Sequence, residues 1–393
     1  MEEEEEPEKS GWGGFKNRMV EISLHVDAHA SNDFITAMDF FQETALINID
    51  EFLDGFRFNF GVGIKPFSFS FNWKDRWGFG LDVAHIEAFG NLALPNNMMT
   101  LQETDDERFG LGAAVFAEML GIPVFFHVKD FKLSIRPAAY VPIFYAEPGF
   151  TYRHQDGRIS VSFDKRIYSA IGMEDLVEDG TMPDFDPWEI AQNNMGYDLS
   201  FGLEYPLFSW LDLGTSMVNI PLPFAMAKLS HYMYLDESHE VFIDTNEIDI
   251  GDLIDSGKIS EDAYKYPEEF NPEYSTGNKL LQRPFTMLAY ANYRPFNRRI
   301  LTLIPSIGFS HNLLYSQPWA IEGGLSARCN LGNLFITTLG VNYNDRRWKN
   351  SLDFALNFRV IELGFGVSVQ SQDFVKSFQG AGLGAQVGLK FGW

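Results

Sequence analysis

The sequence predicts an all-β protein, a transmembrane antiparallel β-barrel of about fourteen strands. Strands of about ten residues recur along most of the chain, each with one apolar face and one face of polar residues or glycine. Aromatic residues gather near the predicted strand ends. The last segment has the same alternation and stops on an aromatic residue, Trp393. Together these three observations favour a barrel whose apolar face meets lipid.

Composition narrows the possible functions. Acidic residues outnumber basic ones 54 to 30, for a formal charge of −24. Nucleic acid is therefore not an expected partner, because phosphate binding needs clustered Lys and Arg. The one cysteine, Cys329, excludes a disulfide framework and a thiolate metal cluster. No run of about 18 apolar residues predicts a helical membrane span.

The first predicted strand, 19–30, shows the alternation most simply. Its length exceeds the usual ~5–6 residues of a strand in a soluble sheet. The apolar face carries Val20, Ile22, Leu24, Val26, Ala28 and Ala30. The polar face carries Glu21, Ser23, His25, Asp27 and His29.

The same alternation returns in 56–64, 131–145 and 197–205, where it places Arg57 and Arg136 on the polar face. A soluble sandwich is the alternative, but its strands would be shorter, with turn signals every 8–12 residues. Later strands are predicted near 285–293, 300–311, 318–329, 333–343, 348–358, 360–370 and 379–393.

Three segments lack this alternation of apolar and polar residues. Residues 1–17 begin with an acidic run and are expected to form a disordered tail. Residues 31–55 have capping residues and apolar spacing typical of short helices, so a plug or cap is expected there. Residues 235–282 form a long acidic segment. The domain prediction is one barrel over 18–393, with 31–55 at its mouth or in its lumen and 235–282 as an extracellular loop.

Tryptophans near strand ends suit the two interfacial girdles of a membrane barrel. They are Trp73, Trp77, Trp210, Trp319 and Trp348. If Trp393 lies at the periplasmic side, successive loops counted backwards from it alternate between the extracellular and the periplasmic side. The short "NLGN" (330–333) then falls inside, and "HNLLYSQP" (311–318) and the long 235–282 segment fall outside. Long loops belong on the extracellular face, so this count is consistent.

Candidate chemical motifs are few. His25 and His29 lie about 13 Å apart on one strand, too far to share a metal ion. Asp27 with either histidine could help to form a site, but a polar row in a hydrated lumen is the simpler interpretation. The acidic residues 244–255 lack the spacing of an EF-hand. Gly-x-Ser-x-Gly, His-Glu-x-x-His and Walker motifs are absent. We therefore expect no enzyme activity, cofactor or metal.

The closing strand resembles that of bacterial outer-membrane β-barrels. Ala381, Leu383, Ala385, Val387, Leu389, Phe391 and Trp393 share its predicted lipid-facing side. The resemblance implies a bacterial outer-membrane location and recognition of this strand by the barrel assembly machinery. The first residues contain no basic region followed by an apolar one. Either the protein is cytosolic or a signal peptide has been removed.

About fourteen strands with an apolar helical element also resemble the outer-membrane long-chain fatty-acid transporters. That family implies a plugged barrel from which hydrophobic compounds leave through an opening in the wall. Its Asn-Pro-Ala motif is absent here, and the helical segment follows the first strand, so no residue-level site transfers from the family.

The predicted function is passive uptake of hydrophobic small molecules such as long-chain fatty acids. The proposed apolar contact comprises Phe34, Phe40, Phe41 and Leu46. Arg57 or Arg136 would pair with a carboxylate head group, since guanidinium matches that geometry. A general porin, and an adhesin or structural barrel that acts through its extracellular loops, remain alternatives. The expected partners are outer-membrane lipid and the hydrophobic substrate.

Overall fold

The computed structural model describes residues 18–32, 56–73, 76–94, 97–98, 102–147, 149–162, 165–172, 186–235, 241–244, 264–265, 273–295, 300–315, 318–358 and 360–393. The predicted tail 1–17 lies outside the described residues, as does the predicted plug 31–55 apart from Ser31 and Asn32. Among the described residues, no helix has the length and apolar character to cross a membrane.

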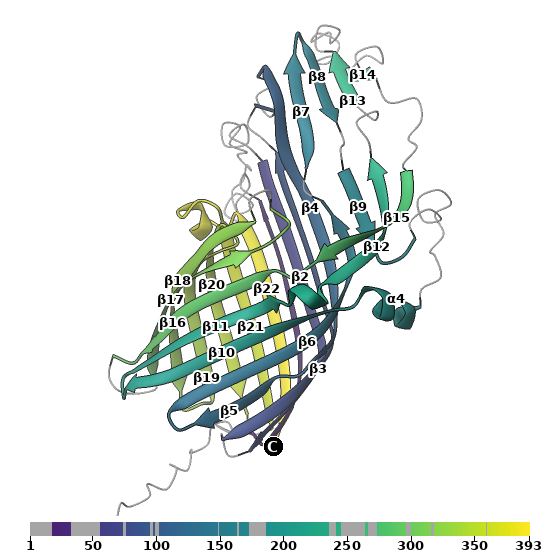
Figure 1. The fold of residues 1–393 in the computed structure, drawn as a ribbon. Helices are drawn as coiled ribbons and strands as arrows, with labels where there is room; N and C mark the ends of the chain where they lie inside the picture. The colour runs from purple at the N-terminus through teal and green to yellow at the C-terminus, as the bar shows by residue number, and fades with distance from the viewer. Residues whose placement is uncertain are drawn as a thin grey trace, which may run out of the picture.

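The described chain forms a closed antiparallel β-barrel with fourteen wall positions, which confirms the predicted fold class and strand number (Figure 1). The first half of the wall comprises β1 (Val20–Asn32), β2 (Phe56–Trp73), β3 (Trp77–Leu94), β4 (Thr104–Gly121) with β5 (Val124–Val128), β6 (Phe131–Ala146), β10 (Gly196–Phe208) and β11 (Leu211–Pro221). The second half comprises β16 (Phe285–Tyr293), β17 (Leu301–His311), β18 (Trp319–Leu331), β19 (Phe335–Asn344), β20 (Arg347–Asn357), β21 (Ile361–Ser371) and β22 (Gly382–Gly392).

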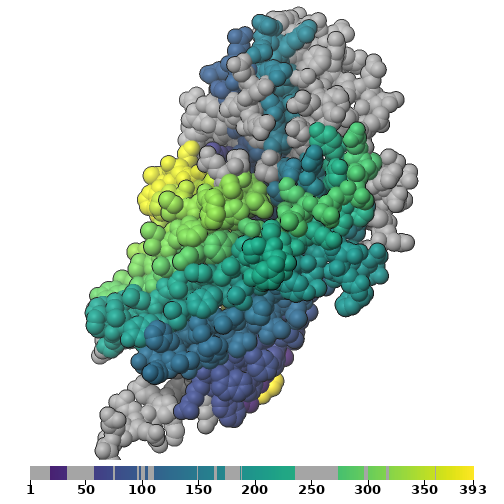
Figure 2. Space-filling model, in the orientation of Figure 1, coloured from purple at the N-terminus to yellow at the C-terminus, as the bar shows by residue number. Residues whose placement is uncertain are grey.

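Backbone pairing runs through this order, and β22 pairs again with β1 to close the ring. The strands β4 and β5 count as one position because both pair with β3 and β6 on either side of Ile122–Pro123. In the space-filling view, neighbouring wall strands cover one face as successive bands, from blue β5 and β6 through teal β10 and β11 to green β16 (Figure 2).

Side-chain exposure confirms the predicted alternation. On β2, every second residue from Phe58 to Ile64 is exposed, whereas Asn59 between them is buried. On β10, Tyr197 is exposed and Asp198 is buried. The outer surface is therefore a continuous apolar belt, as a lipid-facing barrel requires. Other exposed members of this belt are Leu24, Phe79, Ile86, Leu339, Phe365, Val367, Leu383, Val387 and Phe391.

Glycines on β2 make room for the polar row of β1. A side chain at Gly61 would lie 2.3 Å from the imidazole of His29, and one at Gly63 would lie 2.5 Å from the carboxylate of Asp27. These distances are shorter than van der Waals contact, so only glycine fits beside His29 and Asp27. The alternation of glycine with Phe and Val therefore reflects strand packing inside the barrel.

The sheet continues past the barrel at the end opposite the C-terminus (Figure 1). Beyond β6, backbone pairing passes to β9 (Lys165–Ser169), β12 (Ala227–Leu235) and β15 (Glu273–Leu281). The first half of β4 pairs with β7 (Phe150–Gln155), which continues into β8 (Arg158–Ser162), β13 (Val241–Asp244) and β14 (Tyr264–Lys265). Within its described residues, the predicted loop 235–282 thus contains β13, β14 and β15, and β15 occupies residues 273–281.

Two short elements join these parts. The 3₁₀ helix η2 (Pro223–Ala225) connects β11 and β12. The helix α4 (Pro187–Asn194) precedes β10 and is capped by Asp186, whose carboxylate accepts from the amides of Trp188 and Glu189. Its residues Ile190 and Ala191 are buried in the apolar packing beside β6 and β12.

The loop alternation follows the prediction. Antiparallel pairing places the turns 332–334 and 358–360 at the end where the C-terminus lies, and 312–318, 345–346 and 372–381 at the other end. Trp73, Trp77, Trp210 and Trp319 are exposed at strand ends or in turns, as interfacial girdles require.

One residue of the closing strand differs from the prediction. Leu383, Val387, Phe391 and Trp393 are exposed, but Ala381 is completely buried. Ala381 precedes β22 in the loop from β21, where its carbonyl accepts from the Asn32 amide at 3.0 Å. The strand pleat has not begun at this residue, so the alternation no longer sets the direction of its side chain.

Val387→Arg should destabilise the barrel by about 2–4 kcal/mol, because Val387 is near the middle of β22 and faces lipid. Gln386→Arg is the matched control. Gln386 faces inward and donates to Asp353 at 2.6 Å, so arginine there would meet a carboxylate. The stability of both variants is measured by thermal unfolding in lipid vesicles, which the heat-dependent mobility of the barrel on a gel reports. Equal stability of the two variants would contradict the assigned faces.

Candidate functional site in the barrel interior

The loop between β17 and β18 reaches across the interior. Tyr145 on β6 donates its hydroxyl to the Leu313 carbonyl at 3.3 Å, and the Asn59 amide on β2 lies 3.1 Å from the Tyr315 hydroxyl. A side chain at Gly112 on β4 would lie 2.9 Å from the Leu314 carbonyl. Since β2, β4 and β6 lie far around the ring from β17, these contacts bridge the interior.

Local sequence shapes this crossing loop (312–315). The Asn312 carboxamide accepts from the Leu314 amide at 3.0 Å, a turn that Asn favours. The turn directs Leu314 inward, where it is only 4% exposed. Burial raises the pKa of the Tyr315 phenol above its usual value, so the hydroxyl stays protonated at neutral pH, and its oxygen accepts from the Asn59 amide.

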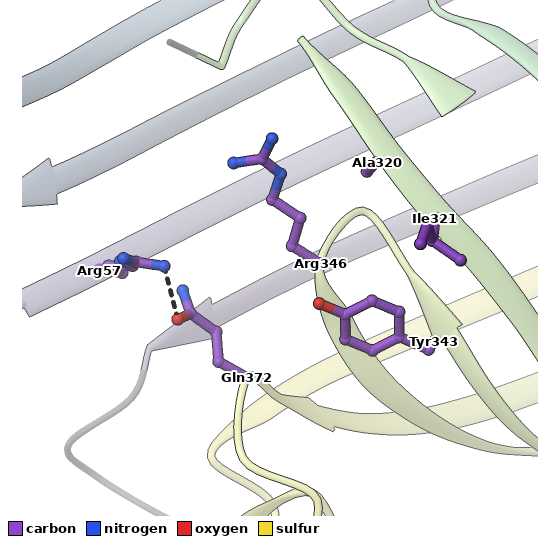
Figure 3. A pocket seen from close by; sticks show the side chains of 6 residues that line it. All are labelled: Arg57, Ala320, Ile321, Tyr343, Arg346 and Gln372. Carbon is purple, nitrogen blue, oxygen red and sulfur yellow. Dashed lines mark hydrogen bonds between the residues drawn. The ribbon is translucent and has the colours of Figure 1, made fainter. Parts of the chain in front are cut away.

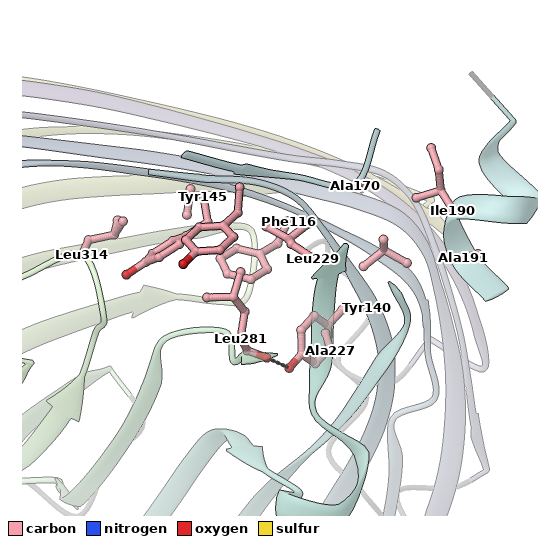
Figure 4. Packing of buried hydrophobic residues seen from close by; sticks show 13 residues of the cluster. Phe116, Tyr140, Tyr145, Ala170, Ile190, Ala191, Ala227, Leu229, Leu281 and Leu314 are labelled. Atoms are coloured by element: carbon pink, nitrogen blue, oxygen red, sulfur yellow. Dashed lines mark hydrogen bonds between the residues drawn. The ribbon is translucent and has the colours of Figure 1, made fainter. Parts of the chain in front are cut away.

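An interior apolar cluster lies next to the crossing loop (Figure 4). The ring of Phe116 is 6.2 Å from that of Phe89 and 6.1 Å from that of Tyr140, both in the range for favourable aromatic pairs. The Tyr140 hydroxyl donates to the Leu281 carbonyl at 3.0 Å. The cluster is defined here as Phe89, Ala114, Phe116, Tyr140, Tyr145, Leu281 and Leu314.

A charge network lies beside this cluster, nearer the C-terminal end. Its centre is Arg283, which is 2% exposed and lies in the short segment between β15 and β16. The guanidinium donates to both carboxylate oxygens of Asp198 at 2.8 and 2.9 Å, and to Glu118 at 2.6 Å. Such a bidentate pair with a third charged partner satisfies a buried guanidinium well.

Arg136, one of the two predicted carboxylate-binding residues, belongs to the same network. It donates to Asp82 at 2.9 and 3.0 Å and is hydrogen-bonded to Glu118. Asp82 also accepts from Ser68 at 2.6 Å and lies 3.4 Å from the Lys65 ammonium. Arg136 therefore faces the interior as predicted, and two carboxylates of the protein balance its charge.

Arg57, the other predicted residue, lies apart from this network at the mouth. It donates to Gln372 at 2.7 Å and lines a pocket of about 430 Å³ together with Tyr343 and Arg346 (Figure 3). Arg346 donates to the Trp319 carbonyl at 3.1 Å and lies over the Tyr315 ring, 5.2 Å from its centre. Two guanidinium groups thus border one pocket, a suitable environment for an anionic group.

The row His25, Asp27 and His29 lines a cavity of about 230 Å³ on the side of the barrel formed by β1 and β19–β22. His25 and Asp27 approach to 3.6 Å. Within the described residues, His, Cys, Asp and Glu form no group of three able to hold a metal ion. The row is a polar lining of the interior, in agreement with the simpler interpretation of the sequence.

The predicted apolar contacts Phe34, Phe40, Phe41 and Leu46 lie outside the described residues. Sequence reasoning did not single out Phe116, Tyr140, Arg283 or Leu314. A signal existed for Leu314, because two adjacent leucines are unusual in a short water-exposed loop. Arg283 carried no such signal, since its carboxylate partners lie 85 and 165 residues away.

Comparisons with known proteins support the fold. No protein-family model and no curated protein matches the chain. A solved structure of a TodX mutant, a monoaromatic hydrocarbon channel, aligns over 96% of this chain and 91% of its own, with a TM-score of 0.51 and 8% identity. The chain shares the fold of that channel.

Two further alignments score lower. The Ralstonia pickettii toluene transporter TbuX gives a TM-score of 0.44 at 9% identity, over 96% of this chain and 90% of its own. A Pseudomonas aeruginosa FadL homologue gives a TM-score of 0.43 at 12% identity, over 97% of this chain and 96% of its own. The closed barrel and its apolar belt are those of a bacterial outer-membrane β-barrel. The bacterial outer membrane is also the location that the closing strand predicts.

Arg283→Met should destabilise the barrel by about 3–5 kcal/mol, because it leaves Asp198 and Glu118 buried without their cation. Lys132→Met is the matched control. Lys132 also pairs with an acidic residue, Glu204, but it is 54% exposed, so its loss should cost only about 0–1 kcal/mol. The heat-dependent gel shift gives both unfolding temperatures, and similar values for the two variants would argue against the network's structural importance.

Proposed function

We propose that this barrel takes up hydrophobic small molecules passively across the bacterial outer membrane. The interior apolar cluster is the observation that carries this proposal. Ligand sites are typically lined by apolar and aromatic side chains with a few polar groups, and the cluster has this composition with the Tyr140 and Tyr145 hydroxyls at its edge. A general porin would have no use for apolar side chains across its lumen.

The shared fold adds independent support. The TodX mutant to which the chain is similar is named a monoaromatic hydrocarbon channel. An aromatic hydrocarbon would pack against Phe89 and Phe116 in the tilted geometry that aromatic rings prefer. Long-chain fatty acids are the second substrate class, and for them the contact would extend to the predicted residues Phe34, Phe40, Phe41 and Leu46.

Two partners belong to the same proposal. The closing strand β22, with its exposed residues up to Trp393, is the segment that the barrel assembly machinery would recognise. The apolar belt would contact outer-membrane lipid. An adhesin role would instead depend on the predicted extracellular loop 235–282, and removing its strands β13 and β14 would then abolish partner binding while uptake continued.

Phe116→Asp should lower the retention of a hydrophobic ligand about tenfold or more, because it places a charge in the cluster. Native mass spectrometry of the detergent-solubilised barrel with toluene or a fatty acid measures retention. Phe125→Asp is the control, since Phe125 lines a separate polar cavity near the C-terminal end. The gel-mobility shift verifies folding of both variants, and Phe89→Asp serves if Phe116→Asp does not fold. A folded cluster variant that keeps its ligand would refute the proposed site.

Arg57→Gln distinguishes the two substrate classes. If the substrate carries a carboxylate, loss of this guanidinium at the mouth should weaken binding about tenfold for a fatty acid and leave toluene unchanged. Arg136→Gln serves for comparison, because Asp82 and Glu118 already occupy that guanidinium. Unchanged fatty-acid binding in Arg57→Gln would remove Arg57 from the site without affecting the apolar cluster.

A further inference from the structure

We propose that the barrel also conducts water, small ions and small polar solutes through a polar conduit that follows the wall formed by β1 and β19–β22 and, near the C-terminal end, is also lined by β2, β5 and β18. This second path is separate from the interior apolar cluster and does not depend on it. It would make the protein a narrow hydrophilic channel as well as a route for apolar molecules.

The conduit consists of three cavities in a row. The first, of about 230 Å³, begins near His29 and Asn344. The second, of about 130 Å³, shares His25, Asp353 and Gln386 with the first. The third, of about 340 Å³, shares Glu362 with the second and ends at Arg18 and Asn333, beside the turns of the C-terminal end. Shared lining residues place the three cavities next to one another along the barrel.

The lining is suited to water. A buried water needs two to four polar partners, and every cavity in the row offers charged or amide side chains. Lys390 pairs with Glu362 at 3.1 Å, and Arg18 pairs with Glu21 at 3.0 Å. Because both signs of charge line the conduit and several are paired, we expect weak selectivity between cations and anions.

Glycines hold the smallest of the three cavities open. Gly364 on β21 and Gly388 on β22 are direct backbone partners, and both line it. A methyl group added at Gly364 would find its nearest atom at 3.8 Å, and one at Gly388 would find it at 3.5 Å. Both distances are ordinary van der Waals contacts, so the space beside these two glycines is unfilled. Gly61 and Gly63, by contrast, are packed against His29 and Asp27.

The two paths are lined by different residues. The cluster residues come from β3, β4, β6, the end of β15 and the crossing loop, and none of them lines the three cavities. A change that blocks one path should therefore leave the other intact. This independence makes the proposal testable apart from hydrophobic uptake.

The experiment is the conductance of the full-length barrel in a planar lipid bilayer in potassium chloride, with swelling of proteoliposomes in glycerol as a second measure. Gly364→Trp should reduce the conductance at least fivefold by filling the smallest cavity. Leu363→Trp is the matched control, because the neighbouring Leu363 faces lipid and its substitution should leave conductance unchanged. Gly388→Trp, on the neighbouring strand β22, should reduce the conductance in the same way.

Toluene retention should be the same in Gly364→Trp as in the unsubstituted protein, which also shows that the variant is folded. The proposal would be overturned by an unsubstituted barrel that conducts no better than the bare bilayer. It would equally be overturned by folded Gly364→Trp and Gly388→Trp variants that conduct as well as Leu363→Trp.

Discussion

The backbone pairing of β22 with β1 is the interaction on which the rest of the structure depends. Inside a bilayer an unpaired backbone N–H or C=O costs several kcal/mol, so a sheet that crosses the membrane must close. Eleven residue pairs, from Glu21–Gly392 to Ser31–Gly382, make that closure. Once it exists, each strand has a lipid side and an interior side, and the period-2 alternation of the sequence follows directly.

Closure also creates an interior of fixed width. Side chains fill one side of this interior more completely than the other. On the side of β3, β4 and β6, large aromatic side chains, the crossing loop and Arg283 fill the space. On the side of β1 and β19–β22, glycines and short polar residues leave it partly open. The two kinds of wall suit two kinds of molecule, because apolar contacts favour hydrocarbons and a charged lining retains water. The division arises from the size of the side chains that face inward.

The alternation was sufficient to predict the barrel, its strand number and the inward direction of Arg57 and Arg136, because these depend on neighbours along one strand. It failed at Ala381, one residue outside a strand. It also could not show that Arg136 meets Asp82 and Glu118 or that Leu314 reaches β4. Those contacts join residues distant in sequence, and their geometry depends on how the ring closes and where the wall turns at η2. The sequence indicated which residues face inward, but not which of them meet.

The charge network constrains the direction of the proposed uptake. Along β3, β4 and β6, the network lies between the apolar cluster and the C-terminal end, so an apolar molecule moving along the barrel axis would have to pass Arg283, Asp198 and Glu118. Displacing these groups from one another would expose buried charges, a cost of several kcal/mol that toluene cannot offset with polar contacts. A route through the wall avoids that cost. The connection η2 between β11 and β12, where Phe224 is 87% exposed, lies near the cluster, because Ala227 at the start of β12 pairs with the cluster residue Leu281.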